Sequence, residues 1–360
     1  MPSTDFFGSL EEHTRVKLLL YNKYLECYLS ILTTIRYIHS IHIYDLFCGK
    51  GETDDGQRGS ALIALNQVIS ICTDYPSSKQ YYIHFSDKEQ EYCDELQRRI
   101  NLISLPANIN YDITCTKFED ALIELAKQQE IISNINTIKT LFFIDPFGYS
   151  NAQPVDLLLL KANPNAEIMI FLPATSMYRF VNTIPVNTSL EKWKDFIGDS
   201  SSCSDVYQFV YSINERFISL GYYSGYFILQ NQSCGNKYAL LFISSNLLGL
   251  HKFNEVKWKL DPHEGFRMDS DFSNLVVPSV SEDLLAKTLY KMKTDLIKHI
   301  DSLPSKTISN NSLYEYLLLN RFLPKHFNGI FKTDKFLKIA YTEGSIKGTY
   351  LVERPIINVL

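Results

Sequence analysis

The chain has 360 residues, of which 45% are apolar and 21% are charged, and its formal net charge is −5. This length suits two domains, and this balance of residues excludes a long disordered protein. The seven cysteines follow no zinc-binding or disulfide spacing, and no apolar run reaches the ~18 residues of a membrane-spanning helix. We therefore expect a cytoplasmic protein with reduced thiols, no metal site and no membrane contact.

Residues 1–40 are predicted to form an N-terminal helical segment that packs on the core, because apolar residues recur with helical spacing from Arg15 to about Ser40. Strands and helices then alternate five times. Strands are expected at 41–46, 81–86, 110–114, 140–144 and 167–172. Helices are expected at 60–71, 88–102, 118–131 and 154–162, with Ser60 as the cap of the first. The strands are apolar throughout rather than alternating, which is typical of a parallel sheet covered on both faces.

The chain after the fifth strand extends this sheet. A polar segment at 174–204 breaks the alternation and is interpreted as an insertion over the carboxyl edge of the sheet. A helix at 206–220 is followed by strands at 223–229 and 237–244, which form a hairpin. These elements predict a Rossmann-like α/β domain over 41–262, whose seven-stranded sheet is parallel except for one antiparallel strand.

A linker and a long helix are expected over 263–302, followed by a separate α+β unit over 303–360. Within that unit, helices at 311–319 and 325–338 precede strands at 339–342 and 347–352. Helices followed by a small hairpin predict a winged-helix-like unit. This end of the chain is weakly basic while the remainder is acidic, which is compatible with contact to phosphates. Residues that could face a phosphate backbone, or form an ordinary solvated helix surface, are Lys325, His326, Lys332, Lys335 and Lys338.

The first candidate site is the turn after the first strand, Asp45-Leu46-Phe47-Cys48-Gly49-Lys50-Gly51. Its two glycines allow a sharp turn and a close approach of the backbone to a ligand. The spacing is not that of a pyrophosphate-binding turn, and it suits S-adenosyl-L-methionine, which has no phosphate. An ordinary turn between strand and helix is the alternative. The predicted cofactor-binding residues here are Asp45, Phe47, Cys48, Gly49 and Gly51.

The second candidate site follows the second strand, at Asp87 and Lys88. A carboxylate at this position can accept hydrogen bonds from both ribose hydroxyls of a nucleotide-like cofactor. A helix cap at Asp87 is a comparably good interpretation of the same residue. Phe118, at the start of the helix after the third strand, is also placed among the cofactor-binding residues.

The third candidate site is Asp145-Pro146-Phe147-Gly148 after the fourth strand, and these four residues are the predicted catalytic group. A carboxylate at Asp145 can hold an exocyclic amine, and Phe147 can stack on a flipped base. Methyl transfer to that amine would then depend mainly on positioning. The alternative is a tight turn, because Asp-Pro and Phe-Gly both favour turns.

An ordinary turn explains each of these sites equally well when the site is taken alone. The three sites, however, fall in order at the ends of strands one, two and four. Because the carboxyl ends of parallel strands share one edge of the sheet, the three sites are expected to lie together. The combination predicts a class I methyltransferase that uses S-adenosyl-L-methionine and acts on an exocyclic amine of a nucleic-acid base, in RNA or DNA.

The chain resembles the three-Cys-motif partner (TcmP) family over nearly its whole length. The motifs that carry the resemblance are Tyr44-Asp45-Leu46-Phe47-Cys48-Gly49-Lys50-Gly51, Gly59-Ser60-Ala61-Leu62, Phe143-Ile144-Asp145-Pro146-Phe147-Gly148, Leu247-Leu248-Gly249-Leu250 and Val256-Lys257-Trp258-Lys259-Leu260-Asp261-Pro262. The resemblance implies a bacterial or archaeal member of the methyltransferase superfamily. It also implies a separate partner protein that carries three cysteines and is similar to radical-adenosylmethionine proteins of phage type.

The Asp145-Pro146-Phe147-Gly148 element also resembles that of tRNA guanine-N2 dimethyltransferases and, more loosely, the Asp-Pro-Pro-Tyr of adenine-N6 enzymes. It departs from the latter because Phe147 stands where the second proline is found. Two alternatives to an active enzyme therefore stay open. One is a catalytically weak, cofactor-binding subunit of a complex with the three-cysteine protein. The other is a winged-helix regulator whose Rossmann-like domain senses a nucleotide.

Overall fold

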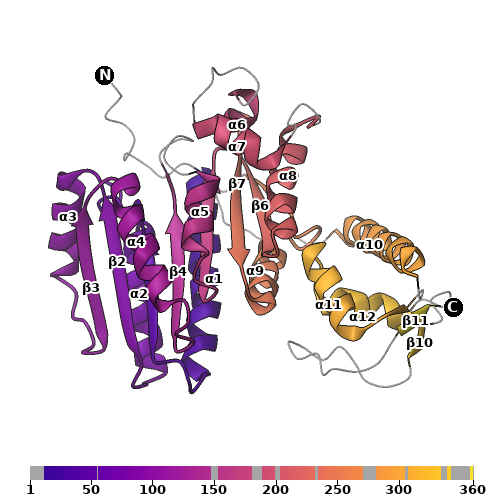
Figure 1. The fold of residues 1–360 in the computed structure, drawn as a ribbon, viewed down its shortest axis with the longest axis horizontal. Coiled ribbons are helices and arrows are strands. Elements are labelled where there is room, and N and C mark those ends of the chain that lie inside the picture. The colour runs from indigo at the N-terminus through magenta and orange to yellow at the C-terminus, as the bar shows by residue number, and fades with distance from the viewer. Residues whose placement is uncertain are drawn as a thin grey trace. The chain divides into compact units, whose positions relative to one another are not determined.

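The computed structural model describes residues 12–54, 56–146, 153–180, 189–198, 203–231, 234–270, 281–304, 307–333, 339–341 and 357–359. The chain forms two compact units (Figure 1). The first comprises Met1–Asn246 with Asp269–Asn274, and the second comprises Leu247–Met268 with Leu275–Leu360.

The first unit is built on one large sheet (Figure 1). Its strands are Ser40–Asp45 (β1), Gln80–Asp87 (β2), Ile109–Cys115 (β3), Ile138–Ile144 (β4), Ala166–Leu172 (β5), Tyr223–Asn231 (β6), Lys237–Ser244 (β7) and Arg267–Ser270 (β8). They lie in the order β3-β2-β1-β4-β5-β7-β6-β8. Strands β1 to β5 pair in parallel, whereas β7 runs antiparallel to both β5 and β6. The first seven strands therefore form the Rossmann-like class I methyltransferase sheet that was predicted, and β8 is an eighth strand that was not.

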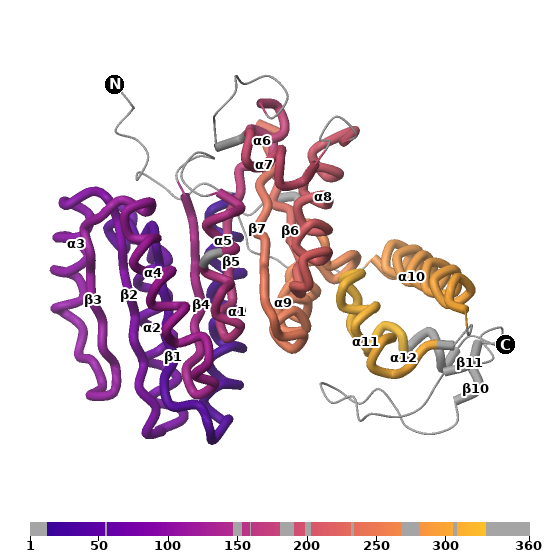
Figure 2. Tube along the Cα trace, in the orientation of Figure 1, coloured from indigo at the N-terminus to yellow at the C-terminus, as the bar shows by residue number. Residues whose placement is uncertain are grey.

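Helices cover both faces of this sheet, as Figure 2 shows. They are Glu12–Thr34 (α1), Ser60–Asp74 (α2), Gln90–Ile100 (α3), Phe118–Ile132 (α4), Pro154–Leu160 (α5), Ala174–Phe180 (α6), Ser189–Ile197 (α7) and Val206–Ser219 (α8). Helix α1 packs with α2, and α4 packs with α5. The central strands are the most deeply buried, with every residue of β5 buried, whereas only Ile109 is buried in the edge strand β3. No helix among the described residues is both long enough and apolar enough to cross a membrane.

Two details of the predicted helices are wrong. Helix α1 ends at Thr34 rather than near Ser40. The Lys79 ammonium donates to the carbonyl oxygens of Ile35 and Ile38 at 2.6 and 2.7 Å, which stabilises the turn that leads into β1. Ser60 does not cap α2, because Gly59 occupies the cap position without a side-chain hydrogen bond and Ser60 is the first helical residue.

The second unit contains four helices and a small sheet among its described residues. They are Leu247–Leu260 (α9), Glu282–Ser302 (α10), Thr307–Ile308 (β9), Asn310–Leu319 (α11), Pro324–Thr333 (α12), Ile339–Tyr341 (β10) and Ile357–Val359 (β11). The strands lie in the antiparallel order β10-β11-β9. The strand predicted at 347–352 lies outside the described residues. A cluster of buried apolar side chains forms the core of this unit: Met292, Leu296, Ile300, Ile308, Leu313, Leu317 and Phe327.

Helix α9 lies within the range 41–262 that was predicted for the Rossmann-like domain, but it groups with the second unit. The Asn254 side-chain amide donates to the Leu318 carbonyl at 2.9 Å, and the Trp258 indole N–H donates to the Arg321 carbonyl at 2.6 Å. These two hydrogen bonds join α9 to carbonyl groups in and just after α11. Helix α9 therefore belongs with the second unit, although it precedes the predicted boundary at residue 262.

Candidate functional site

The turn after β1 depends on two glycines with left-handed backbone conformations, Gly49 at φ +57° and Gly51 at φ +81°. A Cβ at Gly51 would lie 2.7 Å from the Leu96 Cδ1 atom, so this position is restricted by packing as well as by conformation. A Cβ at Gly49 would meet nothing within 4 Å. The backbone at Gly49 therefore borders open space, where a ligand can approach it closely.

Asp87, at the end of β2, connects this turn to the start of the next helix. Its side chain is buried; its Oδ2 atom accepts the Gly49 N–H at 3.0 Å and its Oδ1 atom accepts the Glu89 N–H at 3.0 Å. Helix α3 begins at Gln90 with Glu89 at its cap, so Asp87 shapes the turn before the helix and does not cap it. Each carboxylate oxygen can accept more than one hydrogen bond, so Asp87 can hold the loop and still bind hydroxyl groups.

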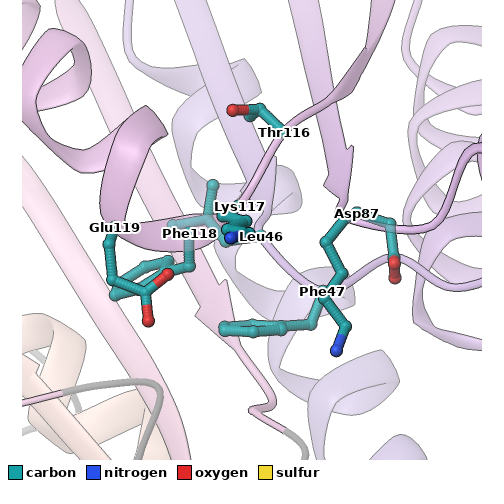
Figure 3. Close-up of a pocket in the computed structure, with 8 residues that line it drawn as sticks. Leu46, Phe47, Asp87, Thr116, Lys117, Phe118 and Glu119 are labelled. Carbon is teal, nitrogen blue, oxygen red and sulfur yellow. The ribbon is translucent and has the colours of Figure 1, made fainter.

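A cavity of about 210 Å³ lies beside Asp87 (Figure 3). It is lined by Leu46, Phe47, Asp87, Lys88, Thr116, Lys117, Phe118 and Glu119. The Phe47 and Phe118 rings stack with their centroids 5.3 Å apart. Ligand cavities usually measure about 300–1,000 Å³, so this one suits part of a ligand such as a flat ring with its sugar.

Four of the predicted cofactor-binding residues line this cavity: Phe47, Asp87, Lys88 and Phe118. Three further residues that line the cavity follow β3 or begin α4 and were not predicted: Thr116, Lys117 and Glu119. The signal was available, because the end of β3 lies at the same edge of the sheet as the ends of β1 and β2. Cys48 does not line the cavity; it is buried, and its N–H donates to the Ser86 carbonyl at 3.0 Å.

Asp45 is a fully buried carboxylate at the end of β1. Its Oδ1 atom accepts the Phe47 N–H at 3.4 Å, and its Oδ2 atom has no hydrogen-bond partner among the described residues. Burial raises the pKa of Asp45 to about 7; the negative charges of Asp145 and Asp87 add to this, whereas the Ser60 hydroxyl and the Phe47 N–H oppose it. A buried carboxylate with an unused oxygen suits a positively charged ligand group, because such a group would remove the cost of ionising it.

Asp145 follows β4 and lies close enough to Asp45 to influence its pKa. It forms a salt bridge with Lys17 of α1. The Lys17 side chain is 7% exposed and the Asp145 side chain is 22% exposed. Asp145 does not line the cavity beside Asp87. Pro146 is buried directly after it, and the predicted residues Phe147 and Gly148 lie outside the described residues.

The site as a whole consists of three carboxylates along one edge of the sheet, each in a different environment. Asp87 is held by backbone N–H groups, Asp45 is buried with one oxygen unused, and Asp145 is paired with a lysine. Such an arrangement can bind a sugar, a cationic group and an N–H donor side by side. Among the residues that the structure describes, no group of three or more potential ligands could hold a metal ion.

No protein-family model and no curated protein matches the chain. Similar solved structures include an O-methyltransferase from Bacillus cereus in complex with SAH, with 10% identity, 67% of this chain and 94% of that chain covered, and a TM-score of 0.34. A putative O-methyltransferase from Klebsiella pneumoniae has 11% identity, with 66% of this chain and 91% of that chain covered and a TM-score of 0.34. TrmK from M. capricolum in complex with S-adenosyl-homocysteine has 13% identity, with 82% of this chain and 94% of that chain covered and a TM-score of 0.26. At these scores the fold assignment rests on the strand order and directions, and not on these likenesses.

Proposed function

We propose that the chain is an S-adenosyl-L-methionine-dependent methyltransferase that acts on an exocyclic amine of a nucleic-acid base. The observation that carries the proposal is the pair of buried carboxylates at the ends of the neighbouring strands β1 and β2, of which Asp87 accepts the N–H of Gly49, a residue that borders open space. Asp87 would accept the ribose hydroxyls, and the unused Asp45 oxygen would face the cationic amino-acid portion.

The cavity supports the same assignment. Phe47 and Phe118 offer aromatic rings on which the adenine can pack, next to Asp87 (Figure 3). The bound sulfonium supplies the methyl group. Leu46 and the two rings give the cavity an apolar side, which would exclude water once the cofactor is bound and so strengthen the hydrogen bonds made there.

Asp145 would act on the acceptor. Its carboxylate would accept an N–H of the exocyclic amine, orient the nitrogen lone pair, and stabilise the positive charge that develops on nitrogen during transfer. Its proximity to Asp45 supports this role, because the acceptor must lie beside the cofactor.

The second unit would contact the nucleic acid. Helices α10, α11 and α12 with the strand order β10-β11-β9 support a winged-helix-like arrangement. Lys325 of α12 is exposed and could reach a phosphate. His326 is not available for that role: it is buried, its ring lies 4.1 Å from the Trp258 ring, and burial with the nearby Lys325 charge lowers its pKa to about 3. A three-cysteine partner protein remains a prediction from the family resemblance.

The test begins with titration calorimetry, using S-adenosylhomocysteine and, in a separate arm, NAD. Binding of the former and not the latter supports the proposal, and the reverse result would point to a nucleotide sensor. The full chain is then incubated with tritiated S-adenosyl-L-methionine and separate pools of tRNA, ribosomal RNA and DNA. Label in one pool supports the nucleic-acid substrate. Cofactor binding without label in any pool would count against an enzyme that acts without a partner.

A further inference from the structure

Helix α1 presents a stripe of polar and aromatic side chains to the sheet. His13, Lys17 and Tyr21 recur every four residues, which places them on one face of a helix. All three are buried. This stripe lies against β4, β5 and β7, because its members contact Phe143, Phe171 and Tyr238.

Lys17 occupies the middle of the stripe and reaches the carboxyl end of β4. Its ammonium forms the salt bridge with Asp145 and lies 4.4 Å from the centroid of the Phe171 ring. Burying a lysine costs several kcal/mol before its partner compensates, and apolar residues often replace such pairs without loss of stability. Because Lys17 is buried while Asp145 is partly exposed, this pair is better explained by what it does to Asp145 than by the stability it contributes.

The residues one turn away on either side of Lys17 make aromatic contacts with the sheet. His13 stacks on Tyr238 with centroids 4.0 Å apart and an interplanar angle of 10°. Burial, together with the charge of Lys17, lowers the pKa of His13 to about 4, so its ring is neutral near neutral pH. Tyr21 stacks on Phe143 with centroids 4.0 Å apart. These two contacts hold the helix, and so the ammonium, at a set position relative to β4.

We propose that Lys17 is a positioning residue for methyl transfer: its ammonium binds the Asp145 Oδ2 atom and leaves Oδ1 to accept the N–H of the acceptor amine. The inference rests on the proposed function. The alternative is an ion pair that only attaches α1 to the sheet. The two differ in their consequence, because a positioning residue affects turnover, whereas an attachment affects only stability.

The test compares three variants of the full chain in the tritium assay, with the nucleic-acid pool that the wild type labels best. Lys17→Met should lower kcat by about 10- to 100-fold, with KM for that pool and the affinity for S-adenosylhomocysteine changed by less than about threefold. Lys17→Arg should restore most of the turnover, because a guanidinium can also bind the carboxylate. Lys23→Met is the matched control on the exposed side of α1, where Lys23 pairs with Glu26, and it should change none of these values.

A second readout does not depend on activity. A water-soluble carbodiimide should join Lys17 to Asp145 as an amide, with loss of one water, because their reacting atoms are already in contact. Peptide mass mapping should find this cross-link in the wild type and not in Lys17→Met. Absence of the cross-link in the wild type, or full turnover in a folded Lys17→Met variant, would overturn the inference. A wild type that binds S-adenosylhomocysteine but labels no pool would instead remove the enzymatic function, and the inference with it.

Discussion

The two ends of the candidate site differ in how their carboxylates are held. On the β1–β2 side, Asp87 is bound by backbone N–H groups of Gly49 and Glu89, which lie in the turns that the same motifs form. On the β4 side, Asp145 is bound by the side chain of Lys17, which is 128 residues away in the chain. The first arrangement is local and contributes to the fold of its own loop. The second is made only when α1 docks on the sheet, so it can be altered with little effect on the loop itself.

The largest effect is expected on the β4 side. Asp145→Asn should reduce kcat by about 100- to 1,000-fold, because an amide cannot stabilise the positive charge that develops on the acceptor nitrogen. The affinity for S-adenosylhomocysteine, measured by calorimetry, should change by less than about twofold, since a neighbouring but separate group would bind the cofactor. Equal losses of turnover and cofactor affinity would mean that both ends of the site act as one structural unit.

The next largest effect is expected from substitution of Asp45, and it concerns the free energy of unfolding. Its folded-state pKa of about 7 exceeds its ordinary value of 3.8, so the folded chain retains a proton that the unfolded chain has lost between these values. The contribution of Asp45 to the free energy of unfolding should therefore fall as pH rises from about 4 to about 7. Asp45→Asn should remove this dependence and stabilise the protein at pH 8 by about 2–3 kcal/mol in urea unfolding.

The same Asp45→Asn variant should bind S-adenosylhomocysteine more weakly at pH 8, because the amide cannot neutralise the ligand ammonium. Gain of stability with loss of affinity is the result expected of a binding residue whose burial is unfavourable. A variant that is less stable than the wild type at pH 8 would show that Asp45 is a structural carboxylate.

On the β2 side, Asp87→Asn should reduce the affinity for S-adenosylhomocysteine by about 10- to 100-fold, as expected for loss of charge-assisted hydrogen bonds. The melting temperature should fall as well, because the Gly49 and Glu89 N–H groups share this acceptor. Asp94→Asn is the matched control, an exposed aspartate on α3 that pairs with Gln90. Unchanged affinity with a lower melting temperature would limit Asp87 to shaping the loop.

The smallest effect is expected in the second unit. Lys325→Ala should weaken binding of the labelled nucleic-acid pool by about two- to fivefold and reduce the slope of log affinity against log salt by about one. Lys287→Ala is the control, because this exposed lysine of α10 pairs with Asp283. An identical salt dependence in wild type and Lys325→Ala would place the phosphate contacts elsewhere.

Most of the first unit could be predicted from the sequence because its signals are local. The apolar runs of β1, β2 and β4 define strands, and the following glycines and aspartates define turns at their ends. Three of the residues predicted from these turns to bind the cofactor, Phe47, Asp87 and Phe118, line one cavity. The salt bridge of Lys17 with Asp145 could not be predicted, since nothing near either residue specifies the other. Strand β9 has two residues and exists through pairing with β11, so its own sequence carries too little pattern to identify it.

The position of β7 also affects how the protein is made. This strand lies between β5 and β6 in the sheet, although both precede it in the chain. Until residues 237–244 leave the ribosome, β5 presents an unpaired backbone edge with the entirely buried sequence Ala-Glu-Ile-Met-Ile-Phe-Leu. An apolar edge strand is a template for pairing with other chains. Nascent chains that stall before Ser244 should therefore aggregate readily, and slow synthesis through this stretch should increase the demand for chaperones.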